Sequence, residues 1–363
     1  MTSTVSPRSL LHTESSIGFG GQEIRILQEA RWLLAHGWNV LVVGQPGSPL
    51  LREAAPDIPH HALAMRHALD VRAFLDLRDL MRERRIDVVH THSSTDSWLA
   101  TLAARSRRRP VVRSRHVAIP VKRRRALVYH LADRVITSGE TIKTVLREAG
   151  VPLRKMVSIP AGIDLARFHP GVSGAGVRAS LGIPGPLVGL VANLRSSKGH
   201  RFFVDAAAEV LRELPESRFL IVGDGVAREP IRRYVEDRGL GKEVLMTGFR
   251  RDIPEVMAAL DVLVLPSIRS EATSQVIPQA LAVGTPVVAT AVGGIPEIVV
   301  DGHTGRLVPA ADTGALSAAI VAMLRDPAAA RAMARRGGAL VRERLSFDAM
   351  MERTAAVYAE LLA

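Results

Sequence analysis

The chain of 363 residues is long enough for two domains, each with its own hydrophobic core. It contains no cysteine, which excludes disulfide bonds, thiolate metal sites, iron–sulfur clusters and a cysteine nucleophile, and favours a reducing compartment. The segment Met1–Arg8 lacks the features of a signal peptide, and no uninterrupted apolar stretch is long enough to span a membrane. We therefore expect a cytoplasmic protein.

The formal net charge of +12 is concentrated in the first half of the chain. Residues 1–170 carry 26 Lys and Arg against 15 Asp and Glu, whereas residues 171–363 carry 22 against 21. Ten basic residues and no acidic residue lie between Arg105 and Arg125. This asymmetry predicts an acidic partner, such as a phosphorylated substrate, an anionic lipid or a nucleic acid, but an arginine-rich solvated surface explains the run equally well.

Apolar runs of strand length alternate with segments of helical period, which indicates α/β architecture with parallel sheets covered by helices. A typical helix is expected over Gln22–His36, with Gly37 at its end. Strands of the first half are expected at Ser9–Thr13, Asn39–Val43, Ile86–Thr91, Val111–Ser114, Arg134–Thr137 and Met156–Ile159. Those of the second half are expected at Leu187–Ala192, Arg218–Val222, Glu243–Met246, Val262–Leu265 and Val287–Ala289. Three prolines and five glycines within residues 168–186 predict a linker between two doubly wound domains.

Ligands of open parallel sheets bind beyond the carboxyl ends of the strands. A glycine-rich turn over residues 18–21 follows the first strand, where backbone can approach an anion, although its spacing is not that of the dinucleotide fingerprint. The turn over residues 193–199, which contains Arg195 and Lys198, suits a phosphate group. His90 and His92 have a spacing that could chelate a metal ion, but no third ligand is evident, and a buried, hydrogen-bonded pair is the simpler interpretation.

Several motifs in combination resemble the retaining glycosyltransferase family 4, also described as glycosyl transferases group 1. They are Gly20–Glu23, Asp87–His92, Pro160–Asp164, Asn193–Gly199, Glu271–Gln279 and Asp301–Gly305. The resemblance implies the GT-B fold, in which two Rossmann-like doubly wound domains face a central cleft. It implies an acceptor-binding domain over residues 1–170, a nucleotide-sugar-binding domain over residues 171–345, and a C-terminal helix over residues 346–363 that packs back on the first domain.

The resemblance implies transfer of a sugar from a nucleotide diphosphate sugar to an acceptor hydroxyl, with retention at the anomeric carbon. It implies no metal and no other cofactor, and the sequence has no Asp-x-Asp pair for a divalent ion. A UDP-sugar is the favoured donor, although the residues leave both base and sugar open. The implied catalytic residues are His116, Glu271, Arg195 and Lys198. The implied donor-binding residues are Gly20, Gly21, Arg195, Lys198, Phe249, Arg250, Glu271, Ala272, Thr273, Ser274 and Gln279.

Each of these residues has an implied role. Arg195 and Lys198 would neutralise the leaving diphosphate. Glu271 would contact the hydroxyls of the donor sugar, and His116 would lie near the donor phosphate and the reacting sugar. The backbone near Phe249 and Arg250 would contact the base. Gln279 stands where the family has a second acidic residue, so its amide would accept a weaker hydrogen bond from the ribose.

The expected acceptor is a lipid-linked or cell-surface glycan of the lipopolysaccharide or exopolysaccharide type. The residues expected to hold the acceptor or an anionic membrane are Arg109, Lys122, Arg123, Arg124 and Arg125. They would place the protein at the inner face of the plasma membrane. No nucleic-acid partner is expected, and the oligomeric state is open.

Two other functions remain compatible with the sequence. A GT-B-shaped sugar-nucleotide epimerase would need catalytic acids in the cleft and would act without an acceptor. A nucleic-acid-binding protein is suggested by charge alone and would bind with steep salt dependence. Aromatic residues make up only 4% of the chain and form no stripe with the basic residues, which disfavours stacking on single-stranded bases.

Overall fold

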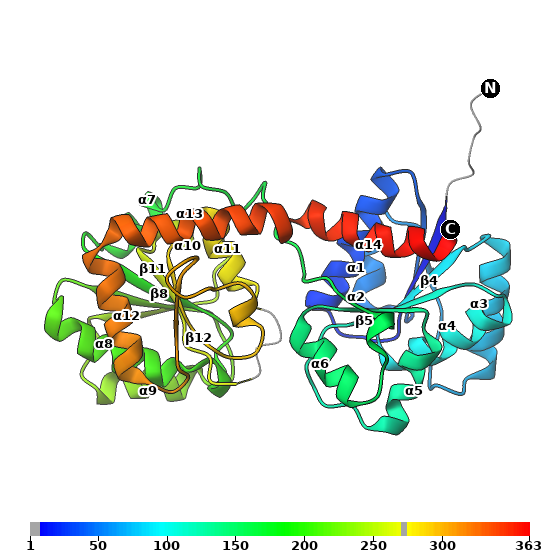
Figure 1. Cartoon of the computed structure of the whole chain (residues 1–363), viewed down its shortest axis with the longest axis horizontal. Helices are drawn as coiled ribbons and strands as arrows, with labels where there is room; N and C mark the ends of the chain where they lie inside the picture. The colour runs from blue at the N-terminus through cyan, green and yellow to red at the C-terminus, as the bar shows by residue number, and fades with distance from the viewer. Residues whose placement is uncertain (1–7, 270–273) are drawn as a thin grey trace. The chain divides into compact units, whose positions relative to one another are not determined.

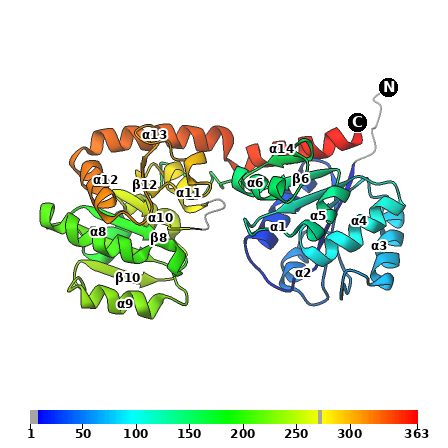
Figure 2. The same ribbon diagram turned by 60° about the horizontal axis from the view of Figure 1, so that its bottom comes forward.

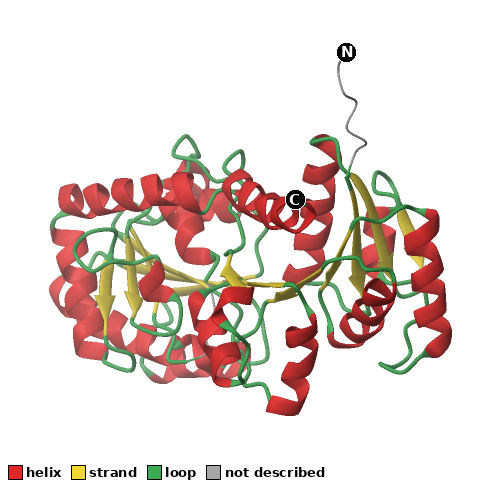
Figure 3. Cartoon of the chain, turned by 45° about the vertical axis from the view of Figure 1, so that its right-hand side comes forward, coloured by secondary structure: helices red, strands yellow, loops and turns green. Residues whose placement is uncertain are grey.

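The computed structural model describes residues 8–269 and 274–363, and the chain divides into two compact units (Figure 1). The first unit comprises the residues up to 161 together with residues 350–363, and the second comprises residues 162–349. Each unit contains a parallel sheet covered by helices (Figure 3). These are two Rossmann-like domains, as predicted.

The first unit holds a sheet of seven strands in the order β3-β2-β1-β4-β5-β6-β7. Its strands are β1 (Ser9–Glu14), β2 (Asn39–Gly44), β3 (His60–Ala62), β4 (Val88–Thr91), β5 (Val111–Arg115), β6 (Arg134–Thr137) and β7 (Met156–Ser158). Its helices are α1 (Gly21–Ala35), α2 (Pro49–Ala54), α3 (Val71–Glu83), α4 (Ser94–Ser106), α5 (Arg123–Leu131) and α6 (Glu140–Glu148), and α14 (Phe347–Leu362) joins them from residue 350 onward. Tyr358 of α14 is fully buried in this unit.

The second unit holds a sheet of six strands in the order β10-β9-β8-β11-β12-β13. Its strands are β8 (Leu187–Val191), β9 (Arg218–Val222), β10 (Val244–Gly248), β11 (Val262–Leu265), β12 (Val287–Thr290) and β13 (Arg306–Val308). Its helices are α7 (Ala175–Leu181), α8 (His200–Glu213), α9 (Arg228–Asp237), α10 (Ile253–Ala259), α11 (Val276–Val283), α12 (Thr313–Arg325) and α13 (Pro327–Arg344).

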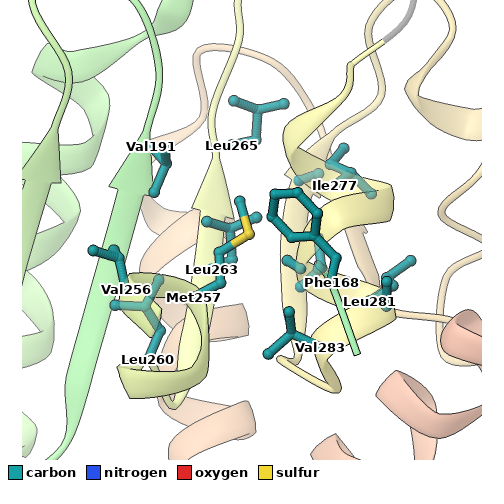
Figure 4. Packing of buried hydrophobic residues seen from close by; sticks show 14 of the residues in the cluster. Phe168, Val191, Val256, Met257, Leu260, Leu263, Leu265, Ile277, Leu281 and Val283 are labelled. Carbon is teal, nitrogen blue, oxygen red and sulfur yellow. The ribbon is translucent and has the colours of Figure 1, made fainter. Parts of the chain in front are cut away.

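The second sheet has a separate hydrophobic core on each face because successive strand residues point to opposite sides. Leu263 and Leu265 of β11 pack on one face with residues of α7, α10, α11 and α13. Figure 4 shows the two leucines with residues of α10 and α11. Val262 and Val264 pack on the other face, where α8 and α12 lie side by side (Figure 2). Because both faces are covered, the strands of this sheet must be apolar at successive positions. Such continuous apolar runs allowed the strands to be predicted from the sequence.

All eleven expected strands are present with ends within two residues of the prediction, and Gly37 has the positive φ expected after α1. Strands β3 and β13, of three residues each, were not predicted. The three residues of β3 are all exposed, and those of β13 are mostly only half-buried, so neither strand has a clear apolar signal. None of the helices in the described ranges is long and apolar enough to cross a bilayer.

The predicted linker over residues 168–186 is wrong. This segment contains α7, and Phe168, Val177 and Ile183 are buried in the core of the second unit. Gly174 lies so close to α10 that a Cβ there would be 2.2 Å from the amide nitrogen of Ala259. Glycine at that position allows close packing of the chain against α10. The glycine and proline content of the segment therefore does not indicate a linker. The expected domain boundary at residue 170 falls inside the second unit.

Candidate functional site

The turn between β8 and α8 presents Arg195 and Lys198 at the carboxyl edge of the second sheet. Leu194 anchors the turn, because its side chain is buried and its amide donates to the carbonyl of Asp224 over 2.9 Å. Gly199 closes the turn with φ +71°, where a Cβ would lie 1.8 Å from the carbonyl oxygen of Pro266. The Arg195 side chain is exposed and that of Lys198 is half-buried, next to the partly positive N-terminus of the 14-residue helix α8. Such a turn suits a phosphate group.

The neighbouring turn after β9 packs against the first one through glycines. A Cβ at Gly223 would lie 1.9 Å from the carbonyl oxygen of Ala192, and one at Gly225 would lie 2.6 Å from Asn193 Oδ1. The next residue, Val226, is 91% exposed. This turn was not predicted from the sequence, although two glycines directly after a predicted strand, Gly223 and Gly225, were an available signal.

Phe249 and Arg250 lie in the turn after β10, beside the β9 turn in strand order. The Phe249 ring is 70% exposed. The Arg250 guanidinium instead binds Asp252, with 2.9 Å between Nε and Oδ1, and this hydrogen bond lowers the pKa of the Asp252 carboxyl. Phe249 therefore offers a free aromatic face, whereas the side chain of Arg250 is held by an ion pair.

The segment after β11 contains the remaining predicted donor residues. Its start is tied to the phosphate-suited turn, because the amide of Ile268 donates to the carbonyl of Ser197 over 2.9 Å. Ser274 is buried before α11, and Gln279 is half-buried within α11. The predicted residues Glu271, Ala272 and Thr273 lie outside the described residues.

The structure thus brings one group of predicted residues to a single edge of the second sheet. This group follows β8, β10 and β11 and comprises Arg195, Lys198, Phe249, Arg250, Ser274 and Gln279. The other predicted donor and catalytic residues, Gly20, Gly21 and His116, belong to the first unit.

In the first unit, three carboxylates hold the glycine turn between β1 and α1. Glu23 accepts from the amide of Gly20 over 2.8 Å and from Ser16 Oγ over 3.0 Å, and Gly21 then begins α1. Glu14 accepts from the Ser16 amide over 2.7 Å and from the side chains of Gln22 and Ser93.

Asp96 completes this network from the start of α4. Its carboxylate accepts from the hydroxyls of Thr13 and Ser15, each over 3.1 Å, and from the amide of His92 over 3.0 Å. Burial, with the charge of Asp96 in addition, raises the pKa of Glu14 to about 7. Neither Glu14 nor Asp96 was predicted from the sequence, because carboxylates so far apart along the chain form no common pattern.

A cluster of buried imidazoles lies on the face of the first sheet that α1 and α14 cover. His92 hydrogen-bonds with His12 over 2.9 Å, and His90 bonds with the Tyr358 hydroxyl over 2.7 Å and the Ser114 hydroxyl over 2.8 Å. His90 and His92 are therefore buried and hydrogen-bonded as predicted, but to other residues and not to each other.

The structure adds His12 as the third histidine that the sequence did not supply. One ring nitrogen of each of His12, His90 and His92 lies within 4.8 Å of the other two. A metal ion there would have to displace Tyr358 or Ser114, because both ring nitrogens of His90 already form hydrogen bonds.

His116, the predicted catalytic histidine, follows β5 and stacks on His92 with 6.2 Å between ring centroids. Burial, with the positive charge of Arg25 in addition, lowers the pKa of His116 to about 3. The imidazole is thus neutral at physiological pH, and its buried Nε2 has no hydrogen-bond partner among the described residues.

The basic run of the first unit does not form one patch. Arg105, Arg107 and Arg109 precede β5 and pair with Asp133, Asp79 and Asp87, respectively. Lys122 and residues 123–125 follow β5 and are exposed. Arg109 is therefore separated from the other four residues predicted to bind an acceptor or membrane, since they lie beyond opposite ends of one strand.

Residues 122–125 form the N-cap and the first three positions of α5. Four positive charges there oppose the helix dipole, so the stability of α5 does not explain them. Three exposed apolar side chains lie close to them in sequence, Val117 (49% exposed), Ile119 (64%) and Leu127 (52%). We call residues 117–127 the basic-apolar segment.

Comparison with known proteins agrees with this architecture. Residues 185–326 match the model of glycosyl transferases group 1, and residues 19–167 match that of glycosyltransferase family 4. The chain is 27% identical over 350 residues to the UDP-Gal:alpha-D-GlcNAc-diphosphoundecaprenol alpha-1,3-galactosyltransferase of Escherichia coli, covering 90% of each protein. It is 30% identical over 343 residues to the 2-deoxystreptamine N-acetyl-D-glucosaminyltransferase of Streptomyces fradiae, covering 83% of this chain and 81% of the relative.

Among solved structures, HepE of Anabaena in complex with UDP superposes with a TM-score of 0.87 at 22% identity, covering 97% of this chain and 100% of HepE. Two Rossmann-like domains with parallel sheets of seven and six strands define the GT-B class of glycosyltransferases. Within that class, the chain belongs to glycosyltransferase family 4, and it is an enzyme that transfers glycosyl groups.

Proposed function

We propose that the enzyme transfers a sugar from a UDP-sugar, with retention, to a lipid-linked or cell-surface glycan acceptor of the lipopolysaccharide or exopolysaccharide type. We further propose that it acts at the inner face of the plasma membrane. The observation that carries the proposal is the turn between β8 and α8, with Arg195 and Lys198 on an anchored backbone at a helix N-terminus.

A turn of this kind would promote the reaction by stabilising the negative charge that develops on the leaving group. When the glycosidic bond to a nucleoside diphosphate breaks, negative charge accumulates on the leaving phosphate. Fixed cations and a helix N-terminus aimed at that charge lower the barrier. On this account Arg195 and Lys198 bind the diphosphate, Gln279 contacts the ribose, and the exposed Phe249 ring lies at the base.

A uridine donor is supported by relatives and by the shared fold. The name of the Escherichia coli relative specifies UDP-Gal as its donor, and the structural neighbour HepE was solved with UDP. Retention, and the roles of Glu271 and His116, are supported by the family motifs in the sequence. The neutral state of His116 is compatible with a hydrogen bond to an uncharged sugar hydroxyl.

The acceptor side is supported by the basic-apolar segment. Each Lys or Arg near an anionic membrane contributes about 1 kcal/mol, so the four exposed charges of residues 122–125 suffice for reversible attachment. The exposed Val117, Ile119 and Leu127 side chains add apolar contacts that an acyl chain would cover. The Escherichia coli relative has a diphosphoundecaprenol acceptor in its name, which is an anionic lipid of this kind.

A thermal-shift panel of UDP, GDP, ADP and their sugars tests the donor directly, because a ligand that binds only the folded state raises its Tm. We expect UDP and UDP-sugars to raise the Tm and the other nucleotides to have little effect. Release of UDP that requires an added acceptor would separate a transferase from an epimerase. A panel in which no nucleoside diphosphate raises the Tm would contradict the proposal.

A further inference from the structure

Helix α13 contains two consecutive glycines in its interior, Gly337 and Gly338. Glycine is the poorest helix former after proline, whereas the first half of this helix is rich in alanine, the best one. Both glycines are buried. A pair of glycines at such a place indicates that another part of the chain approaches the helix closely.

The approaching residue is Leu281 of α11. A Cβ at Gly337 would lie 2.6 Å from the Cδ2 atom of Leu281, and a Cβ at Gly338 would lie 2.8 Å from the carbonyl oxygen of Leu281. Carbon atoms do not approach other atoms so closely without displacement. The two glycines therefore allow α11 to lie directly on the backbone of α13.

Helix α11 also packs into the hydrophobic core of the second unit. Figure 4 shows Ile277 and Leu281 of α11 in this core near Phe168. At the N-terminus of α11 the amide of Ile277 donates to the Ser274 hydroxyl over 3.5 Å. The helix is thus packed between the core and α13, and its first turn is joined to Ser274.

Helix α11 carries Gln279, two residues before Leu281, and begins just after the buried Ser274. We infer that the Gly337–Gly338 pair positions the donor site, because the absence of side chains at these two positions sets how closely α11 lies on α13 and hence where Gln279 stands. This inference rests on the proposed function, in which Gln279 contacts the ribose of the nucleotide.

The two glycines should differ when each is replaced by alanine. The methyl group of Gly338→Ala would meet a backbone carbonyl, so α11 itself would have to move. The methyl group of Gly337→Ala would meet only the end of the Leu281 side chain, which can change rotamer. A larger effect on the donor site is therefore expected from Gly338→Ala.

Calorimetric titration with UDP, together with the Tm of each variant, tests the inference. Gly338→Ala should bind UDP at least fivefold more weakly than the unaltered chain at a temperature where both are folded. Gly176→Ala in α7 is the matched control, because no atom lies within 4 Å of a Cβ at that helical position. It should bind UDP with unchanged Kd.

If Gly338→Ala does not fold, Gly337→Ala takes its place in the titration. Its weaker binding of UDP should be restored by adding Leu281→Ala, which removes the side chain that the new methyl group meets. A lowered Tm with an unchanged Kd for UDP would show that the pair only stabilises the fold and would overturn the inference. Absence of UDP binding by the unaltered chain would contradict the proposed function itself, and this inference with it.

Discussion

Arg195 and Lys198 are the side chains on which the proposed chemistry depends most. Each is expected to form charge-assisted hydrogen bonds worth roughly 1.5–3 kcal/mol with the diphosphate. Arg195→Ala and Lys198→Ala should therefore each lower kcat/KM for the UDP-sugar at least tenfold. Arg212 on α8 provides a control of the same charge, since it is exposed at the last turn of that helix. If both variants keep the kcat/KM of the unaltered chain, the diphosphate does not bind at this turn.

Gln279 allows a gain of affinity to be tested. A carboxylate makes hydrogen bonds about twice as strong as a neutral amide, and Gln279 lies in the first turn of α11, where the helix dipole favours a negative charge. Gln279→Glu should bind UDP up to about tenfold more tightly, equivalent to roughly 1.4 kcal/mol. Calorimetry with a UDP analogue lacking both ribose hydroxyls is the control, and the gain should vanish there. If Gln279→Glu binds UDP more weakly, or gains as much affinity for the analogue as for UDP, residue 279 does not contact the ribose hydroxyls.

At the scale of elements, the carboxylates around the β1–α1 turn make the stability of the first unit depend on pH. The folded-state pKa of Glu14 is about 7, above its usual 4.5, so the folded unit binds this proton more tightly than the unfolded chain does. The stability that protonated Glu14 contributes is therefore complete below about pH 4.5 and is lost as the pH rises to 7. From the shift, this loss is on the order of 3 kcal/mol.

Glu14→Gln should remove that loss, so the free energy of unfolding should fall less between pH 5 and pH 8 in the variant than in the unaltered chain. Tryptophan fluorescence in urea measures this in the right unit, because all three tryptophans, Trp32, Trp38 and Trp98, lie in the first unit. Glu53→Gln, at an exposed position of α2, is the control. Parallel pH profiles for all three proteins would show that Glu14 is ionised in the folded state at neutral pH.

Helix α5 provides the second prediction at this scale. Replacing Lys122, Arg123, Arg124 and Arg125 with Glu should abolish binding to anionic vesicles, and binding by the unaltered chain should weaken with added salt. The variant should fold normally, because acidic residues at a helix N-terminus are favoured by its dipole.

The matched control for this experiment changes the net charge equally at exposed positions spread over the first unit. These positions are Arg72, Arg84, Arg147 and Arg154. Sedimentation with vesicles should show that this control still binds. Loss of binding in both variants would mean that net charge and not the basic-apolar segment attracts the membrane, and equal binding to neutral vesicles would reject an electrostatic contribution.

For the whole molecule, the sequence predicted the two sheets well because buried parallel strands require continuous apolar runs. Arg195 and Lys198 could be predicted from the sequence because they directly follow such a run, at the sheet edge where ligands bind, whereas Phe249 was predicted only from the family resemblance. Strand β3 was not predicted, because its residues are exposed and give no apolar signal. The glycine-rich segment around Gly174 was predicted to be a linker, but Gly174 allows close packing against α10.

Contacts between distant parts of the chain could not be read from local patterns. The meeting of Glu14 with Ser93, and of His12 with His92, depends on β1 and β4 being neighbours in the sheet. The basic run was one feature in the sequence, but β5 passes through it, so the ion-paired Arg105, Arg107 and Arg109 lie beyond one end of the strand and residues 122–125 beyond the other. Knowledge of which strands pair is needed before such residues can be grouped.

The central claim is retaining transfer of a sugar from a UDP-sugar. Its most direct measurement is nuclear magnetic resonance of the product formed from α-configured UDP-sugars and a diphosphate-linked lipid acceptor. The account predicts an α-linked product, identified by the coupling constant of its anomeric proton, with one UDP released for each sugar transferred. A β-linked product would contradict retention, and the absence of acceptor-dependent UDP release from every UDP-sugar would contradict the proposed donor.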